Sequence, residues 1–136
     1  MLSPTTDTIR LYLHVLAASI WVGGQIALAG VVPVLRRDAP HATKAVARAF
    51  ARLAWPAFAV LLATGLWSLV DIDVADTDTP YQITVFVKVS LSITAAVAVA
   101  VHSLATSKIS LVLGGAIGLL SSLAAMFLGI LLRTGT

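Results

Sequence analysis

The 136-residue chain contains no cysteine and few charged residues, and these shortages exclude several classes of protein. Without cysteine there can be no disulfide, no iron–sulfur cluster and no thiolate metal site. Charged residues make up 11% of the chain, against about 25% in an ordinary soluble domain. Hydrophobic residues make up 59%, and the mean hydropathy is +0.99. The composition therefore excludes a disordered chain and argues against a water-soluble enzyme, because a soluble domain of this length cannot bury so much apolar surface.

Four long apolar runs occupy most of the chain, at about residues 10–35, 53–70, 81–105 and 109–132. Each run matches the ~17–25 residues that a helix needs to cross ~30 Å of hydrocarbon. A helix satisfies all its backbone hydrogen bonds within one segment, as lipid requires. The sequence therefore predicts an all-α fold, an integral membrane four-helix bundle that forms a single transmembrane domain over residues 1–136. We expect a multi-pass protein of the plasma membrane.

The charges between the runs predict the orientation. The connection between the first two runs holds five basic residues, Arg36, Arg37, Lys44, Arg48 and Arg52, whereas the second connection holds four aspartates and no base. The positive-inside rule then predicts that both termini lie outside. Residues 41–52 are predicted to form an amphipathic basic extension of the second span, for which setting topology is the simpler role. The net charge of +3 fits this topology, so we expect no nucleic-acid partner.

Local signals predict where one span begins and where helices pack closely. Thr79 is expected to cap the third span, with Pro80 as its first helical residue. The fourth span carries a stripe of small residues that includes Gly114, Gly118 and Ser122. Small residues permit close contact between membrane helices. The stripe therefore predicts either packing inside the bundle or a homodimer face.

Polar side chains at membrane depth are costly and are therefore functional candidates. His14 and Lys88 are expected at similar depth in the outer half of the membrane. His102 shares a helix face with Lys88 and lies ~21 Å deeper, at 1.5 Å per residue. The two histidines are thus expected to serve separate sites, or one site and one structural role. Simpler roles are a hydrogen bond for His14, an amine reaching the headgroups for Lys88 and a solvated ring for His102.

The available donors restrict the chemistry. No acid lies within a span, so neither hydrolysis by a nucleophile–histidine–acid set nor an ion channel is expected. Copper prefers soft or imidazole ligands, and the methionine of the fourth span, Met126, is expected near the depth of His14. A b-type haem needs only one axial histidine in a helix bundle, and Lys88 or Arg133 would pair with its propionates. The expected cofactor is therefore copper or haem b, and these residues leave the choice between the two open.

Several short motifs lie along the spans. The first span contains Leu13-His14 followed by Trp21-Val22-Gly23-Gly24, and the second contains Ala63-Thr64-Gly65-Leu66. The segment Thr79-Pro80-Tyr81 precedes Phe86-Val87-Lys88. These motifs resemble the CopD-like membrane family (copper resistance protein D), in which a T-x-Y element precedes an in-span lysine. The similarity covers most of the chain.

The resemblance implies a membrane protein that handles a redox-active metal centre, in copper homeostasis or transport or as a haem b protein. It implies His14 as the first ligand. The chain is also similar to HemJ-type protoporphyrinogen oxidases, which share a first-span histidine and a third-span lysine followed by a histidine, matched by His14, Lys88 and His102. An enzyme of that kind is one alternative, although an activity is not the main expectation. The other is a structural subunit of a larger membrane complex, for which a redox protein or another membrane subunit is the expected partner.

Overall fold

The structure is a computed structural model and describes residues 1–135. Its four long helices are α1 (Thr6–Asp38), α2 (Thr43–Ile72), α3 (Thr79–Ser103) and α4 (Lys108–Thr134). Short 3-10 turns precede α2 and α3, η1 (Pro40–Ala42) and η2 (Val74–Asp76), and no strand occurs within residues 1–135. The predicted all-α fold is confirmed. All four helices are long and apolar enough to cross a membrane.

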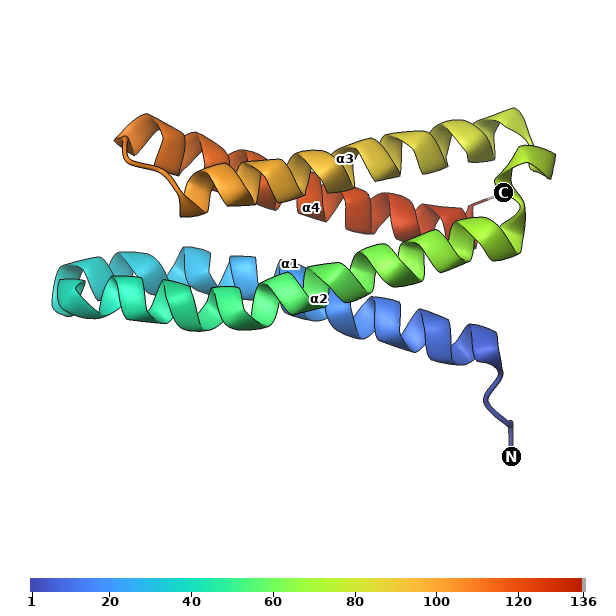
Figure 1. Cartoon of the computed structure of the whole chain (residues 1–136), viewed down its shortest axis with the longest axis horizontal. Coiled ribbons are helices and arrows are strands. Elements are labelled where there is room, and N and C mark those ends of the chain that lie inside the picture. The colour runs from blue at the N-terminus through green and yellow to red at the C-terminus, as the bar shows by residue number, and fades with distance from the viewer. Residues whose placement is uncertain (136) are drawn as a thin grey trace. The chain divides into compact units, whose positions relative to one another are not determined.

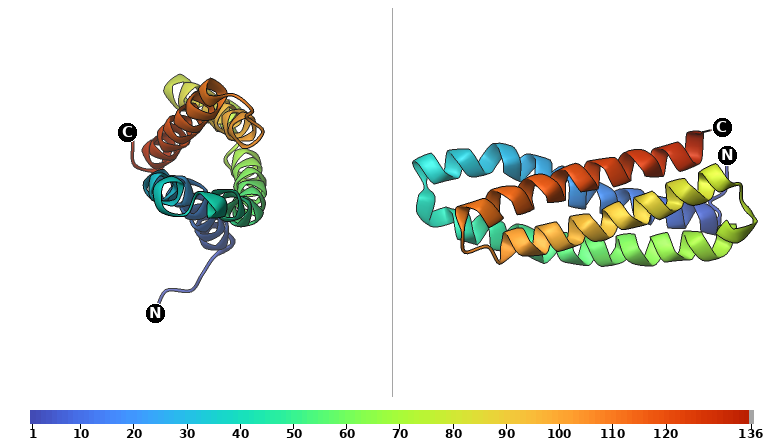
Figure 2. Two further views of the ribbon diagram at one scale, coloured as in Figure 1. Left: turned by 90° about the vertical axis from the view of Figure 1, so that its left-hand side faces the viewer. Right: turned by 90° about the horizontal axis from the view of Figure 1, so that it is seen from above.

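The chain divides into two compact units, one ending at Ile72 and the other beginning at Asp73. Each unit is a pair of antiparallel helices, α1 with α2 and α3 with α4 (Figures 1 and 2). We call these units the first hairpin and the second hairpin. A short connection between two helices makes them antiparallel neighbours, so each hairpin follows directly from its short turn.

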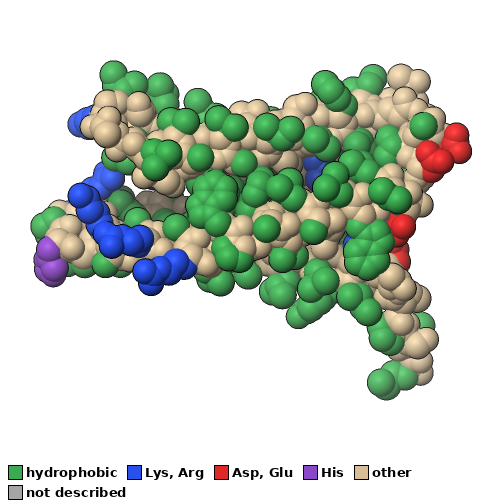
Figure 3. All heavy atoms as spheres, viewed as in Figure 1, with side chains coloured by type: hydrophobic (Ala, Val, Ile, Leu, Met, Phe, Trp, Pro, Cys, Tyr) green, Lys and Arg blue, Asp and Glu red, His purple; other side chains and the backbone are tan. Residues whose placement is uncertain are grey.

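Each hairpin is held together by small residues, while large apolar side chains point outward. Ala17, Ala54 and Ala57 are buried in the first hairpin, and Ala95 and Ala98 in the second. Large apolar side chains remain exposed on every helix (Figure 3), for example Val70, Phe86 and Phe127, at 79%, 73% and 64%. Small residues between helices and large ones outside are typical of helices that pack in lipid, because lipid is as apolar as the side chains.

The start of α3 differs by one residue from the prediction. Asp78, and not Thr79, is the N-cap, and its carboxylate accepts a hydrogen bond of 2.9 Å from the Tyr81 N–H. Thr79 is therefore the first helical residue and Pro80 the second. A carboxylate at this position also interacts favourably with the positive end of the helix dipole.

An ion-pair cluster connects α1 and α2 at the end of the first hairpin that lies opposite its turn. Arg10, near the start of α1, is 6% exposed. Its guanidinium donates to Asp71 on α2, with 2.5 Å between Nη1 and Oδ2, and its Nη2 donates to Asp7 one turn earlier. Because Asp71 comes from the other helix, it ties the end of α2 to the start of α1.

Replacing Asp71 with asparagine should weaken this connection. The variant keeps a hydrogen-bond acceptor but loses the charge, and hydrogen bonds to charged groups contribute more than neutral ones. Since Asp71 is half exposed, we expect a loss of about 1–2 kcal/mol in the free energy of unfolding. Unfolding in mixed micelles, followed by circular dichroism, measures it. Asp73→Asn is the matched control, because the Asp73 side chain has no ion pair in residues 1–135; equal losses in both variants would contradict the cluster's role.

Candidate functional site

The first candidate, His14, is held by a hydroxyl from the neighbouring helix. His14 lies two turns into α1, and Thr64 lies two turns before the end of α2. The two residues are at nearly the same distance from the turn of the hairpin, so they are level with each other. The imidazole Nδ1 and the Thr64 Oγ1 are 2.7 Å apart. Thr64 is 3% exposed, whereas His14 is half-buried.

The partners of Thr64 favour one tautomer of His14. The Thr64 hydroxyl has one hydrogen, and the carbonyls of Val60, at 2.7 Å, and Leu61, at 3.2 Å, are placed to accept it. With the hydrogen donated on this side, the hydroxyl accepts from His14, and Nδ1 is the protonated nitrogen of the neutral ring. The lone pair is consequently on Nε2. A metal-ligating histidine usually has this arrangement, in which one nitrogen donates to a neighbour and the other is the ligand.

Small residues surround the imidazole. Gly65 follows Thr64, and a methyl group at Gly65 would lie 3.9 Å from the His14 Cε1. Ala17 lies on the same side of α1 one turn further on and is 3% exposed. The ring therefore lies where α1 and α2 approach closely.

An aromatic cluster fills the hairpin beyond His14. Trp21 on α1 is 3% exposed and packs on two rings of α2. Its ring centroid lies 4.6 Å from that of Phe58 and 5.5 Å from that of Trp55. These contacts stabilise the pairing of α1 with α2 beyond their buried area. The cluster thus fixes the register that places His14 beside Thr64.

His102 makes a similar contact in the second hairpin. Its Nδ1 lies 2.6 Å from the carbonyl oxygen of Leu111 on α4. A carbonyl can only accept, so Nδ1 donates and the lone pair of the neutral ring is again on Nε2. The ring lies against two glycines of α4, and a methyl group at Gly115 would lie 3.0 Å from its Nδ1.

Lys88 also belongs to the second hairpin. Its side chain is partly buried and lies across α4, where a methyl group at Gly129 would lie 3.2 Å from its Nζ. The amine makes no hydrogen bond or ion pair with residues 1–135. Met126 is on α4 of the same hairpin and is 41% exposed. Among residues 1–135 no group of three or more His, Asp or Glu side chains is placed to hold a metal ion.

The stripe of small residues on α4 packs against α3. Gly114 and Gly118 are buried, and a methyl group at Gly114 would lie 2.9 Å from both the Ala98 carbonyl oxygen and the His102 amide nitrogen. Ser122 is 4% exposed and donates to the Gly118 carbonyl. Packing within the chain is therefore the observed role of this stripe. A homodimer through it stays a prediction and would have to displace α3.

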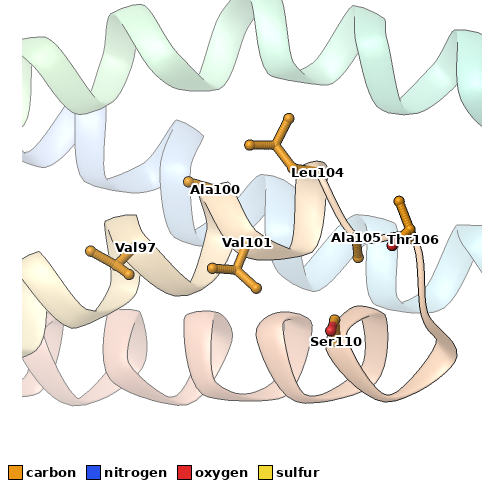
Figure 4. Close-up of a pocket in the computed structure, with 7 residues that line it drawn as sticks. All are labelled: Val97, Ala100, Val101, Leu104, Ala105, Thr106 and Ser110. Carbon is orange, nitrogen blue, oxygen red and sulfur yellow. The ribbon is translucent and has the colours of Figure 1, made fainter.

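A shallow groove of about 380 Å³ lies beside the turn of the second hairpin. Figure 4 shows its lining at the end of α3, in the turn and on the first turn of α4. Its polar side chains are the hydroxyls of Thr106 and Ser110 alone. The groove carries no acid, base or histidine and offers no site for acid–base or metal chemistry.

Two residues that matter for the site were missed from the sequence. From the sequence, Thr64 enters only within the Ala63–Leu66 motif, and no role is predicted for Arg10. A polar side chain inside an apolar run, level with His14 across the turn, is the signal that would have identified Thr64.

Comparisons with known protein families, with curated proteins and with solved structures found no match to this chain.

Proposed function

We propose that this chain is a multi-pass membrane protein that binds haem b through His14. The observation that carries the proposal is the hydrogen bond from His14 Nδ1 to Thr64, which leaves the lone pair on Nε2. An iron porphyrin supplies four ligands itself and needs only one or two from the protein. A single oriented histidine is therefore the donor set that haem requires.

Copper is less well supported by the same residues. Copper sites use several imidazole or sulfur ligands from the protein. Within α1 and α2, His14 is the only histidine or methionine, since His41 lies in η1 between them; Met126 and His102 belong to the second hairpin. The donor chemistry of the first hairpin thus favours haem over copper.

Each residue around His14 has a definable part in the proposed site. Bound haem b would supply a one-electron redox centre. His14 would hold the haem iron, Thr64 would keep the ring of His14 in one tautomer and orientation, and Ala17 and Gly65 would keep bulky side chains away from it. We further propose Lys88 as a binding position for an anionic group of a cofactor or substrate, and His102 as a ligand at a separate, second site.

The membrane orientation is part of the proposal. The four helices are long and apolar enough to span a membrane, and basic residues gather on both sides of the turn between α1 and α2. With this turn in the cytoplasm, both termini lie outside. His14 is then in the outer half of the membrane.

An absorption spectrum of the full chain, purified in mild detergent, tests the proposal. The spectrum is recorded oxidised and then dithionite-reduced, with metal analysis of the same sample. A Soret band that sharpens on reduction, with stoichiometric iron, is the expected result. Stoichiometric copper without a Soret band would overturn haem binding. If neither metal is present after haem and copper have been offered, the structural-subunit alternative replaces this proposal. Oxidation of protoporphyrinogen by the haem-loaded protein would identify the enzyme alternative.

Replacing Thr64 with valine should weaken haem binding without removing the ligand. Valine keeps the shape of threonine but cannot accept the proton of Nδ1, so the imidazole loses its tautomer and its orientation. Outer partners of metal-ligating histidines typically contribute about 10–100-fold to affinity, and we expect a loss in this range. Haem titration at the Soret maximum measures it. Thr64→Ser retains the hydroxyl and should bind as the wild type does; equal affinity in Thr64→Val and Thr64→Ser would show that Thr64 does not orient the ligand.

A further inference from the structure

Three basic residues form a line along the start of α2. Lys44, Arg48 and Arg52 recur every four residues, and all three are exposed. Successive members are separated by ~6 Å along the helix and by only ~40° around it. None of them makes an ion pair or a side-chain hydrogen bond with residues 1–135. We call these three residues the basic stripe.

The basic stripe lies on the face of α2 that points away from α1. The α1-facing side is marked by Ala54, Ala57 and Thr64, which are buried, and by Phe50, which contacts Gly24. At ~100° per residue, the centre of the stripe is ~160° from this side. Its side chains therefore project from the first hairpin and do not stabilise the pairing of its two helices.

The position of the stripe along α2 matches the headgroup layer of a membrane. The apolar run that follows it, residues 53–70, is ~27 Å long, close to the thickness of the hydrocarbon core. Trp55, one turn inside Arg52, is of the type that favours the membrane interface. Arg52 is then at the edge of the hydrocarbon, and Arg48 is ~6 Å further out, within the headgroup layer. Lys44 follows ~6 Å beyond and remains within a Debye length of the surface.

Little negative charge near the turn offsets the stripe. Asp38 is the one acid between residues 8 and 70, and it is bound by Arg37 through a hydrogen bond of 2.8 Å. On the face seen in Figure 3, Lys and Arg side chains gather near the turn of the first hairpin, and no acidic side chain is seen beside them. The stripe is therefore free to attract an external anion.

We propose that the basic stripe binds the phosphate headgroups of anionic phospholipids and holds them at the cytoplasmic face of α2. The proposal rests on the membrane insertion that the proposed function assumes, but not on the haem site. It goes beyond topology, because it assigns the binding to three positions on one helix face. Each basic residue near an anionic surface contributes about fivefold to binding.

The test compares two variants of the full chain with equal net charge. Lys44→Gln/Arg48→Gln removes two charges from the stripe, and Arg36→Gln/Lys108→Gln removes two exposed charges elsewhere on the same predicted side of the membrane. Native mass spectrometry in mild detergent gives the affinity for phosphatidylglycerol and for phosphatidylcholine. Wild type and the control variant should prefer phosphatidylglycerol, and the stripe variant should bind it about thirtyfold more weakly. Arg48→Lys, which keeps the charge, should stay close to wild type.

Three results would overturn the proposal. One is a wild-type protein without preference for phosphatidylglycerol, and another is an equal loss in both double variants, which would reduce the effect to net charge. The third is binding of a single-stranded oligonucleotide, but not of phosphatidylglycerol, by the basic stripe at physiological salt. That result would make nucleic acid the partner. The helical circular-dichroism signal establishes folding of each variant. The Soret band, unaffected by the stripe variant, separates failure of this proposal from failure of haem binding.

Discussion

His14→Ala protein is expected to contain no haem after purification and to bind added haem more than about 100-fold less tightly than wild type. The reason is that the variant removes the ligand itself, whereas outer partners alone contribute about 10–100-fold. Thr64 still donates its proton to Val60 and Leu61, so no buried hydroxyl is left without a partner. The variant should therefore fold as wild type does. Haem content and the Soret titration are measured on the same purified sample.

His102→Ala is the matched control for this variant. It removes an imidazole with the same Nδ1 donor arrangement from the second hairpin. Haem bound through His14 alone should survive this change. If His14→Ala retains haem while His102→Ala loses it, His14 is not the axial ligand and the assignment of the two histidines is reversed.

The second large effect is expected on stability, from Gly114→Leu. A Cβ at this position would lie 2.9 Å from two backbone atoms of α3, those of Ala98 and His102. Backbone atoms of a packed helix cannot move aside as a flexible side chain can, so α3 and α4 must separate. Overpacking typically costs 1–3 kcal/mol, and we expect a loss of about 3 kcal/mol in the free energy of unfolding. Unfolding in mixed micelles, followed by circular dichroism, measures it.

Gly23→Leu is the control for Gly114→Leu. Gly23 is an exposed helical glycine of α1, and a Cβ there would meet nothing within 4 Å. Because glycine costs about 1 kcal/mol in a helix relative to alanine, this variant should be neutral or slightly stabilising. Similar stability of the two variants would show that α3 and α4 do not approach as closely as Gly114 indicates.

The helices could be predicted from the sequence because apolar runs of sufficient length leave few alternatives in lipid. Their ends were harder to locate. The charges at residues 36–52 mark the end of the hydrocarbon, and the predicted extension of the second span through residues 41–52 is present as the continuation of α2 back to Thr43. The start of α3 was placed one residue late, because Thr and Asp are both good caps and only the Asp78 hydrogen bond decides between them.

Of the two residues at the centre of the candidate site, His14 could be predicted from the sequence and Thr64 could not. His14 was identified by the cost of a polar group within an apolar run. Thr64 was missed, because a hydroxyl can bond to its own helix and so costs little in a span. Only the register of the hairpin brings it level with His14. That register depends on the length of the turn and on the packing of Trp21 against Phe58. The sequence of either apolar run alone does not show how the two helices pack.

Arg10 shows the limit of assigning depth from charge alone. A basic residue at the end of a span is expected to reach water or headgroups. In the structure Arg10 is buried because Asp7 and Asp71 supply two carboxylates at the same level. Asp71 is distant in sequence, so its contribution requires knowledge of how α1 and α2 pair.

Rescue of a His14→Gly variant by free imidazole is the sharpest test of His14 as the haem ligand. The variant lacks the ring but keeps Thr64, and free imidazole can occupy the vacated space and present a nitrogen lone pair to the iron. His14→Gly is expected to purify without haem, and haem added together with imidazole should restore the Soret band and a one-to-one stoichiometry. Haem retained by His14→Gly without imidazole, or haem binding that imidazole does not restore, would contradict the assignment of His14 as the ligand.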